Sequence, residues 1–163
     1  MATLSAAEYT TFVRSDFYTF THRAFLELNP QTAFLHNWHN ELVAAKLDDC
    51  RRGKITRLII NLPPRSLKSH AAVVAFPAFI LGHNPCAQVI CASYGQDLAS
   101  KHSLDCRSLM ASAWYQGLFS TRLSAQKQSV QEFHTTQGGF RFATSVGGVP
   151  GRRSAHATNS QIE

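Results

Sequence analysis

The segment that most constrains the fold is NLPPRSLKS, residues 61–69, which lies between two apolar runs. The run before it predicts a strand over residues 55–61, and such nearly continuous hydrophobicity is typical of a parallel strand that is buried on both faces. The run after it predicts a helix over residues 68–81, which Pro77 should kink or interrupt. A strand, a tight loop and a helix that begins at Lys-Ser together form the layout of a phosphate-binding loop.

The same segment also has a plain structural interpretation. The standard phosphate-loop pattern, G-x-x-x-x-G-K-[ST], has two glycines, and Leu62 and Leu67 stand in their places. A bulky side chain at position 67 disfavours the positive φ that glycine adopts without strain. Lys68 and Ser69 nevertheless hold the positions of the lysine that contacts the outer phosphates and the hydroxyl that binds Mg2+. From the pattern alone, a nucleotide site and an ordinary strand-to-helix turn are both open.

The rest of the chain alternates between helical and strand periodicity. Helices are predicted over residues 5–28, 36–52, 96–110 and 111–119. Strands are predicted over residues 88–93, 130–136 and 139–144, and the last two should form a hairpin. Ser5 and Glu8 have the spacing of a capping box, and Gly53 should end the second helix. This order of elements predicts an α/β domain with a partly parallel sheet.

Composition narrows the setting and the partners. The chain has 163 residues, enough for one domain, and a net charge of +6 from 16 Lys and Arg against 10 Asp and Glu. Such a charge suits an anionic partner such as nucleic acid, and it also suits an ordinary solvated surface. No segment approaches the ~18 apolar residues that cross a membrane, and the N-terminus is not a secretory signal. The four cysteines form no C-x-x-C pair, so we expect reduced thiols in the cytoplasm.

A series of short segments resembles one family. The loop sequence from Pro63-Pro64-Arg65 to Lys68-Ser69 is similar to that of large terminase subunits, the motors that package viral DNA in tailed phages. The resemblance covers residues 16–152, and its specificity lies in the order of the series. The other matching segments are WH at 38–39, RRGKITRLIIN at 51–61, FPA at 76–78, LGHNP at 81–85, ASY at 92–94, DLA at 97–99, GG at 147–148 and GR at 151–152.

The resemblance implies a partial P-loop NTPase domain, RecA-like and of the additional-strand type, with N-terminal helices and a β-hairpin. Its cofactors would be ATP and Mg2+. Lys68 would contact the outer phosphates and Arg65 would stabilise the γ-phosphate, which makes them the catalytic residues, and Ser69 would bind Mg2+. The residues that cradle the nucleotide would be Pro64, Arg65, Ser66, Leu67, Lys68 and Ser69. Trp38 and His39 match the region that flanks the adenine, although we expect Trp38 to be a core residue.

The resemblance also divides the chain and names its partners. It implies an N-terminal helical segment at residues 1–53, a partial ATPase core at 54–152 and a divergent polar tail at 153–163. The implied partners are double-stranded DNA and, in the family, the small terminase subunit and the portal protein. We expect no membrane association, a bacterial host cytoplasm, and homo-oligomers only at full length.

The C-terminal tail departs from the family. In terminases the Gly-Arg segment is soon followed by a hydrophobic strand that ends in paired acidic residues, but here the sequence is SAHATNSQIE, and Glu163 is its single acid. We therefore expect a chain truncated before its catalytic strand and without the nuclease domain, with little or no ATP hydrolysis of its own. The alternative is a non-catalytic nucleotide- or DNA-binding fragment from a decayed prophage. Arg152 is a candidate for contact with DNA or a neighbouring subunit's nucleotide, and a solvated tail is the other interpretation.

Overall fold

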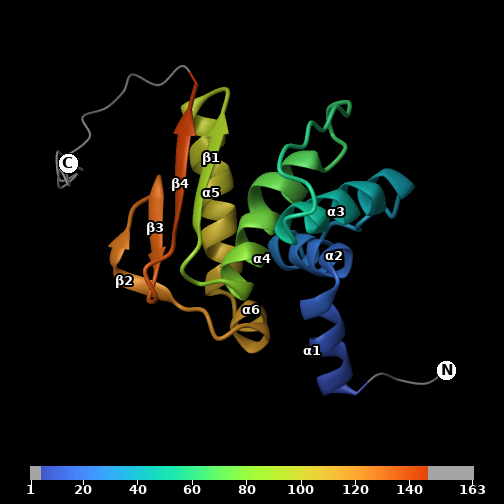
Figure 1. Cartoon of the computed structure of the whole chain (residues 1–163), viewed down its shortest axis with the longest axis horizontal. Helices are drawn as coiled ribbons and strands as arrows, with labels where there is room; N and C mark the ends of the chain where they lie inside the picture. The colour runs from blue at the N-terminus through green and yellow to red at the C-terminus, as the bar shows by residue number, and fades with distance from the viewer. Residues whose placement is uncertain (1–4, 147–163) are drawn as a thin grey trace, which may run out of the picture.

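The computed structural model describes residues 5–146, in which six α-helices and one π-helix lie to one side of a four-stranded sheet (Figure 1). The helices are α1 (Ala6–Ser15), α2 (Phe17–Leu28), α3 (Trp38–Arg51), the π-helix η1 (His70–Ala75), α4 (Phe76–His83), α5 (Gln96–Ala111) and α6 (Ala113–Leu118). The strands are β1 (Gln88–Ser93), β2 (Leu123–Gln128), β3 (Glu132–Thr135) and β4 (Phe140–Ser145). The prediction of a mixed α/β domain is confirmed at this level.

The sheet has the order β1-β4-β3-β2 and is mixed. β1 runs parallel to β4, with Val89 opposite Arg141, and β4 runs antiparallel to β3, with His134 opposite Phe140. The predicted hairpin is confirmed, and Gly138 in its turn has a φ of 89°. β2 was not predicted, because its sequence, LSAQKQ, is polar and lacks the alternation of a half-buried strand.

The predicted strand over residues 55–61 is wrong. This segment follows Gly53 and reaches the loop without entering any strand of the described chain. Leu58 and Ile60 pack against the core, whereas Ile59 between them is 95% exposed. The burial alternates as in a strand, but β-propensity acts through pairing with a neighbour, and no described strand lies alongside.

Local capping decides the N-terminal helices. The predicted helix over residues 5–28 is two helices, because Asp16 leaves the helical region (φ −112°, ψ 111°) and its side chain caps α2 by accepting from the Thr19 N–H at 2.7 Å. The capping box of Ser5 and Glu8 is confirmed. Gly53, with a φ of 73°, follows the end of α3 as predicted.

The core face of α3 does not include Trp38. Val43, Ala44 and Leu47 are its buried residues. Trp38 is 73% exposed and Leu42 is 49% exposed, so the expected core role of Trp38 is wrong. Aromatic content alone could not distinguish the two faces, because α3 carries apolar residues on both.

A continuous helical run begins at Lys68, as predicted, and its first part has the π form. Phe76 N–H donates to Ala71 O, five residues back. Pro77 has no N–H for the carbonyl of Val73, four residues back. Arg141 Nη2 donates to that carbonyl at 3.1 Å and so ties β4 to the helix that follows the loop.

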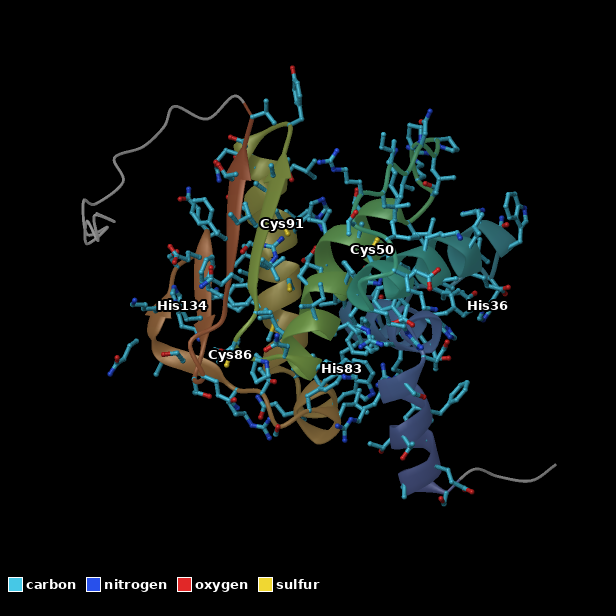
Figure 2. The ribbon with its side chains drawn as sticks, in the orientation of Figure 1. His36, Cys50, His83, Cys86, Cys91 and His134 are labelled. Carbon is cyan, nitrogen blue, oxygen red and sulfur yellow. The ribbon has the colours of Figure 1, made fainter. Side chains whose placement is uncertain are left out.

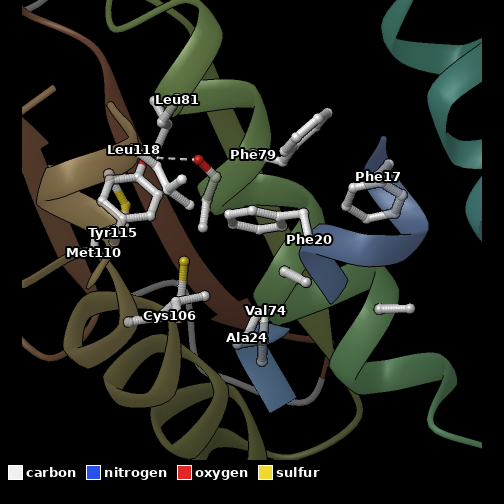
Figure 3. Close-up of a cluster of buried hydrophobic side chains, with 14 of the residues drawn as sticks. Phe17, Phe20, Ala24, Val74, Phe79, Leu81, Cys106, Met110, Tyr115 and Leu118 are labelled. Carbon is white, nitrogen blue, oxygen red and sulfur yellow. Dashed lines mark hydrogen bonds between the residues drawn. The ribbon is translucent and has the colours of Figure 1, made fainter. Parts of the chain in front are cut away.

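The core lies among α2, the η1–α4 run, α5 and α6 (Figure 3). Phe20 packs on Phe79 with ring centroids 5.0 Å apart, and Tyr115 donates to Ala78 O at 2.8 Å. Because Phe79, Ala78 and Val74 all belong to the run that starts at Lys68, this core holds the loop-to-helix junction in place. Within residues 5–146, none of the helices has the length and apolar character that a membrane span requires.

Candidate phosphate-binding site

The loop before Lys68 has an unusual backbone. Arg65 has a φ of 64° and Leu67 a φ of 59°, which places two non-glycine residues in the left-handed region. That conformation costs about 1–2 kcal/mol for each residue with a side chain. Leu67 therefore adopts the positive φ expected of a glycine before the Lys-Ser pair, despite its bulk. Strain of this kind persists where the surrounding fold imposes it, and it clusters at ligand sites.

The same backbone leaves an array of free donors. Over residues 65–70, no main-chain N–H donates to a main-chain carbonyl anywhere in the described chain, and the first such bond runs from Ala71 N to Leu67 O at 2.9 Å. Alternating left- and right-handed residues turn successive N–H groups toward one concave side, and helix N-termini add partial positive charge. The arrangement suits an anion with several oxygen atoms.

Lys68 lies across this loop. Its Nζ donates to Leu62 O at 2.6 Å, so the ammonium is held over the segment that its own helix follows. Ser66 Oγ donates to Pro63 O at 2.8 Å and stiffens the turn. Ser69 follows Lys68 in the first helical turn, and its side chain makes no capping hydrogen bond.

The remaining loop residues lie at its tip. Pro64 and Arg65 are exposed, whereas residues 66–69 are partly buried. Pro64 has no N–H, so it can shape the loop but cannot donate to a phosphate. The guanidinium of Arg65 is free to move toward a ligand, since no ion pair of the described residues includes it.

A pocket of about 270 Å³ adjoins the loop. Arg65, Ser66 and Leu67 form one side of it. The other side consists of Phe25, Ala33, Leu35, Asn37, His39 and Asn40. Of the two residues that match the adenine-flanking region of the family, His39 lines this pocket and Trp38 does not. Asn37 and Asn40 were missed; the signal that could have found them is the polar run HNWHN at the start of a helix that otherwise carries apolar residues.

The histidines and cysteines labelled in Figure 2 are spread over the molecule. Within residues 5–146, no three His, Cys, Asp or Glu side chains gather in a way that could hold a metal ion. All four thiols, Cys50, Cys86, Cys91 and Cys106, are unpaired. Mg2+ bound by a nucleotide needs fewer protein ligands, because the phosphates and water supply most of its oxygen atoms.

His70, one residue beyond Ser69, connects the loop helix to α2. Its Nε2 donates to Thr21 O at 3.1 Å. Burial lowers the pKa of His70 and is the largest influence; the bond to Thr21 and the charge of Asp105 oppose it, while His102 and Lys101 reinforce it. Burial also lowers the pKa of His102. His70 and His102 together line a second pocket, of about 200 Å³.

These lowered pKa values predict loss of stability in acid. The unfolded chain binds protons on these histidines near pH ~6.5, whereas the folded chain binds them only at lower pH. The free energy of unfolding should therefore fall as the pH drops below ~6.5 toward the lower, folded-state pKa values. Urea denaturation from pH ~8 to ~5 measures this fall. His70→Gln should have a shallower slope across this range, and a slope equal to that of the wild type would contradict the assignment.

Loop strain predicts an unequal effect of two substitutions at position 67. Leu67→Ala and Leu67→Gly remove the same apolar side chain, but only glycine accepts a φ of 59° without strain. Leu67→Gly should therefore be about 1 kcal/mol more stable to urea than Leu67→Ala, after the greater unfolded-state entropy of glycine is counted. An alanine variant that matches or exceeds the glycine variant would mean that the loop is not left-handed there.

Comparisons with known proteins return no relative. No protein-family model, curated protein or solved structure matches the chain. Arg152, the glycine-arginine segment at 147–152 and the tail at 153–163 lie outside the described residues. The candidate site therefore consists of residues 62–70 and the pocket beside them.

Proposed function

We propose that residues 62–69 bind the phosphates of Mg2+–ATP, and that the chain is the N-terminal ATPase portion of a large terminase subunit. One observation carries the nucleotide proposal. A loop without glycine holds Arg65 and Leu67 at positive φ directly before a helix, and the free N–H groups of residues 65 and 66 extend the row of unpartnered N–H groups that the start of the helix leaves at residues 67–70. Strained backbone of this kind clusters at ligand sites, and N–H groups turned toward one concave side are what a phosphate cradle supplies.

In this proposal each loop residue has a distinct part. Lys68 Nζ exchanges Leu62 O for the outer phosphates, which are a stronger, charged acceptor. The hydroxyl of Ser69 binds Mg2+, and Arg65 swings from the loop tip to the γ-phosphate. The main-chain N–H groups of Arg65, Ser66 and Leu67 donate hydrogen bonds to the inner phosphate oxygens.

The adjoining pocket would receive the base and sugar. Its volume of about 270 Å³ is small for a whole ligand, but the phosphates occupy the loop and not the pocket. The side-chain amides of Asn37 and Asn40 and the ring of His39 supply donors and acceptors for a base edge.

The wider part of the proposal concerns DNA. The resemblance to terminases and the net charge of +6 support double-stranded DNA as a partner. In the same proposal the small terminase subunit and the portal protein are partners of the full-length protein. Binding of duplex DNA that weakens steeply with added salt would support this part, and binding unchanged from ~50 to ~200 mM salt would oppose it.

Calorimetric titration of the whole chain tests nucleotide binding. Mg2+–ATP, Mg2+–ADP and tripolyphosphate should all bind, because the loop recognises phosphate oxygens, and adenosine should bind much more weakly. Comparing ATP with tripolyphosphate isolates the contribution of the base pocket. Absence of heat with both ATP and tripolyphosphate at millimolar concentration would overturn the phosphate-loop proposal, whereas tripolyphosphate binding alone would remove only the base pocket.

A further inference from the structure

One cation in the interior lacks a counter-charge. Arg141 on β4 is fully buried and is the largest fully buried side chain among the described residues. Its Nη2 donates to Val73 O, but its Nε and Nη1 have no hydrogen-bond partner. No ion pair within residues 5–146 includes it. A guanidinium removed from water without an anionic partner is strongly unfavourable, so this position favours any nearby group that can become an anion.

A thiol occupies the adjoining position on the same face of the sheet. The parallel register pairs Val89 with Arg141 and Cys91 with Ala143, so Cys91 lies diagonally across from Arg141. Diagonal neighbours are within the reach of a long side chain. Burial raises the pKa of the Cys91 thiol, and the guanidinium of Arg141 is close enough to oppose that rise.

Cys91 is less enclosed than the other thiol near Arg141, Cys106. β1 is an outer strand of the described sheet, and Cys91 is only partly buried, whereas Cys106 on α5 is fully enclosed. Figure 2 shows Cys91 on the side of β1 that faces the helices. Arg141 points to the same side, because its Nη2 donates to Val73 O in η1. The edge at β1 is therefore the side from which a small oxidant would have to approach this sulfur.

We propose that Cys91 is an oxidation site whose sulfinate product is held by Arg141. The oxidant is a peroxide. The Cys91 thiol gives its proton to water, the thiolate attacks one peroxide oxygen, and the O–O bond breaks to give sulfenic acid and hydroxide, which takes up a proton to become water. A second peroxide oxidises the sulfenic acid to sulfinic acid and leaves as water, and the sulfinic acid releases its proton to become an anion. The two new oxygens accept from Nε and Nη1 of Arg141, which otherwise have no partner.

Peroxide treatment of the whole chain tests this proposal, with peptide mass spectrometry of each cysteine and Arg141→Met as the variant. Cys91 sulfinate should form more slowly in Arg141→Met, by a factor of ten for each pKa unit by which the guanidinium favours the thiolate. Cys86, which is exposed, is the internal reference and should oxidise equally in both chains. Equal rates at Cys91 in both chains, or no sulfinate at Cys91 in the wild type, would overturn the proposal.

A second pair of variants keeps the proposal testable if Arg141→Met does not fold. Cys91→Asp places a carboxylate diagonally across from Arg141, and Cys91→Asn has nearly the same shape without the charge. With Arg141 present, Cys91→Asp should unfold at a higher urea concentration than Cys91→Asn. The order should reverse in an Arg141→Met background that folds, since the carboxylate would then be unpaired. An aspartate variant less stable than the asparagine variant beside Arg141 would overturn the proposal.

Discussion

Replacing Lys68 with alanine is expected to abolish measurable binding of Mg2+–ATP. The ammonium of Lys68 is already held over the loop by Leu62 O, so it needs little rearrangement to meet a phosphate. Charge-assisted hydrogen bonds to phosphate oxygens are about twice as strong as neutral ones. Their loss should cost about 3 kcal/mol, or roughly a hundredfold in Kd. Calorimetry on the wild type and Lys68→Ala measures this difference directly.

Two controls make the Lys68 result specific. Lys46→Ala removes the same charge from an exposed position on α3 and should leave the affinity unchanged. Urea denaturation of Lys68→Ala should show that the variant remains folded, since the side chain is only partly buried and its single bond is to one carbonyl. Equal affinity in the wild type and Lys68→Ala, with both folded, would refute the phosphate-loop assignment.

Gly139→Ala should destabilise the fold more than the same change at Gly117 or Gly138. A Cβ on Gly139 would come within 2.6 Å of Ala87 O and 2.9 Å of the Cys86 carbonyl carbon, and both are backbone atoms. Gly139 N donates to Pro85 O and Phe140 N donates to Ala87 O. The hairpin and the segment before β1 therefore cannot move apart without breaking these hydrogen bonds. Overpacking of this kind costs about 1–3 kcal/mol. With the lost hydrogen bonds we expect about 3 kcal/mol or more by urea denaturation.

Other glycines of the same chain provide matched controls. Gly117 in α6 has no atom within 4 Å of a built Cβ, so Gly117→Ala should stabilise the helix by about 0.5–1 kcal/mol. Gly138 also has open space but a φ of 89°, so Gly138→Ala reports backbone strain alone. If Gly139→Ala cost no more than Gly138→Ala, the close approach of the hairpin to the segment before β1 would be wrong.

The correct predictions came from signals a few residues apart. Ser5 and Glu8 are three positions apart and form the capping box, and the glycines between β3 and β4 mark the hairpin turn. The start of a helix at Lys68 and the strand at Gln88–Ser93 were likewise predicted from local pattern. These features depend on backbone preferences and neighbouring side chains, which the sequence states directly.

The wrong predictions share a different cause. Residues 55–61 have the apolar run of a buried strand, but a strand also needs a neighbour with which to pair. Trp38 has a side chain typical of a core, but α3 packs through Val43 and Leu47. In both cases the local preference was real and the outcome depended on which surface met the rest of the chain.

The sequence by itself determined the helix that starts at Lys68, the strand at Gln88–Ser93, the capping box of Ser5 and the β3–β4 hairpin, because each follows from interactions within a short stretch. Tertiary structure alone decided that Leu67 takes the backbone of a glycine, and that Asn37 and Asn40 meet the loop across a pocket. It also decided that Arg141 is buried without a counter-charge. Each of these depends on contacts between segments far apart in the chain. Such contacts can impose a strained backbone or bury a charge, because packing over the whole core outweighs the local cost.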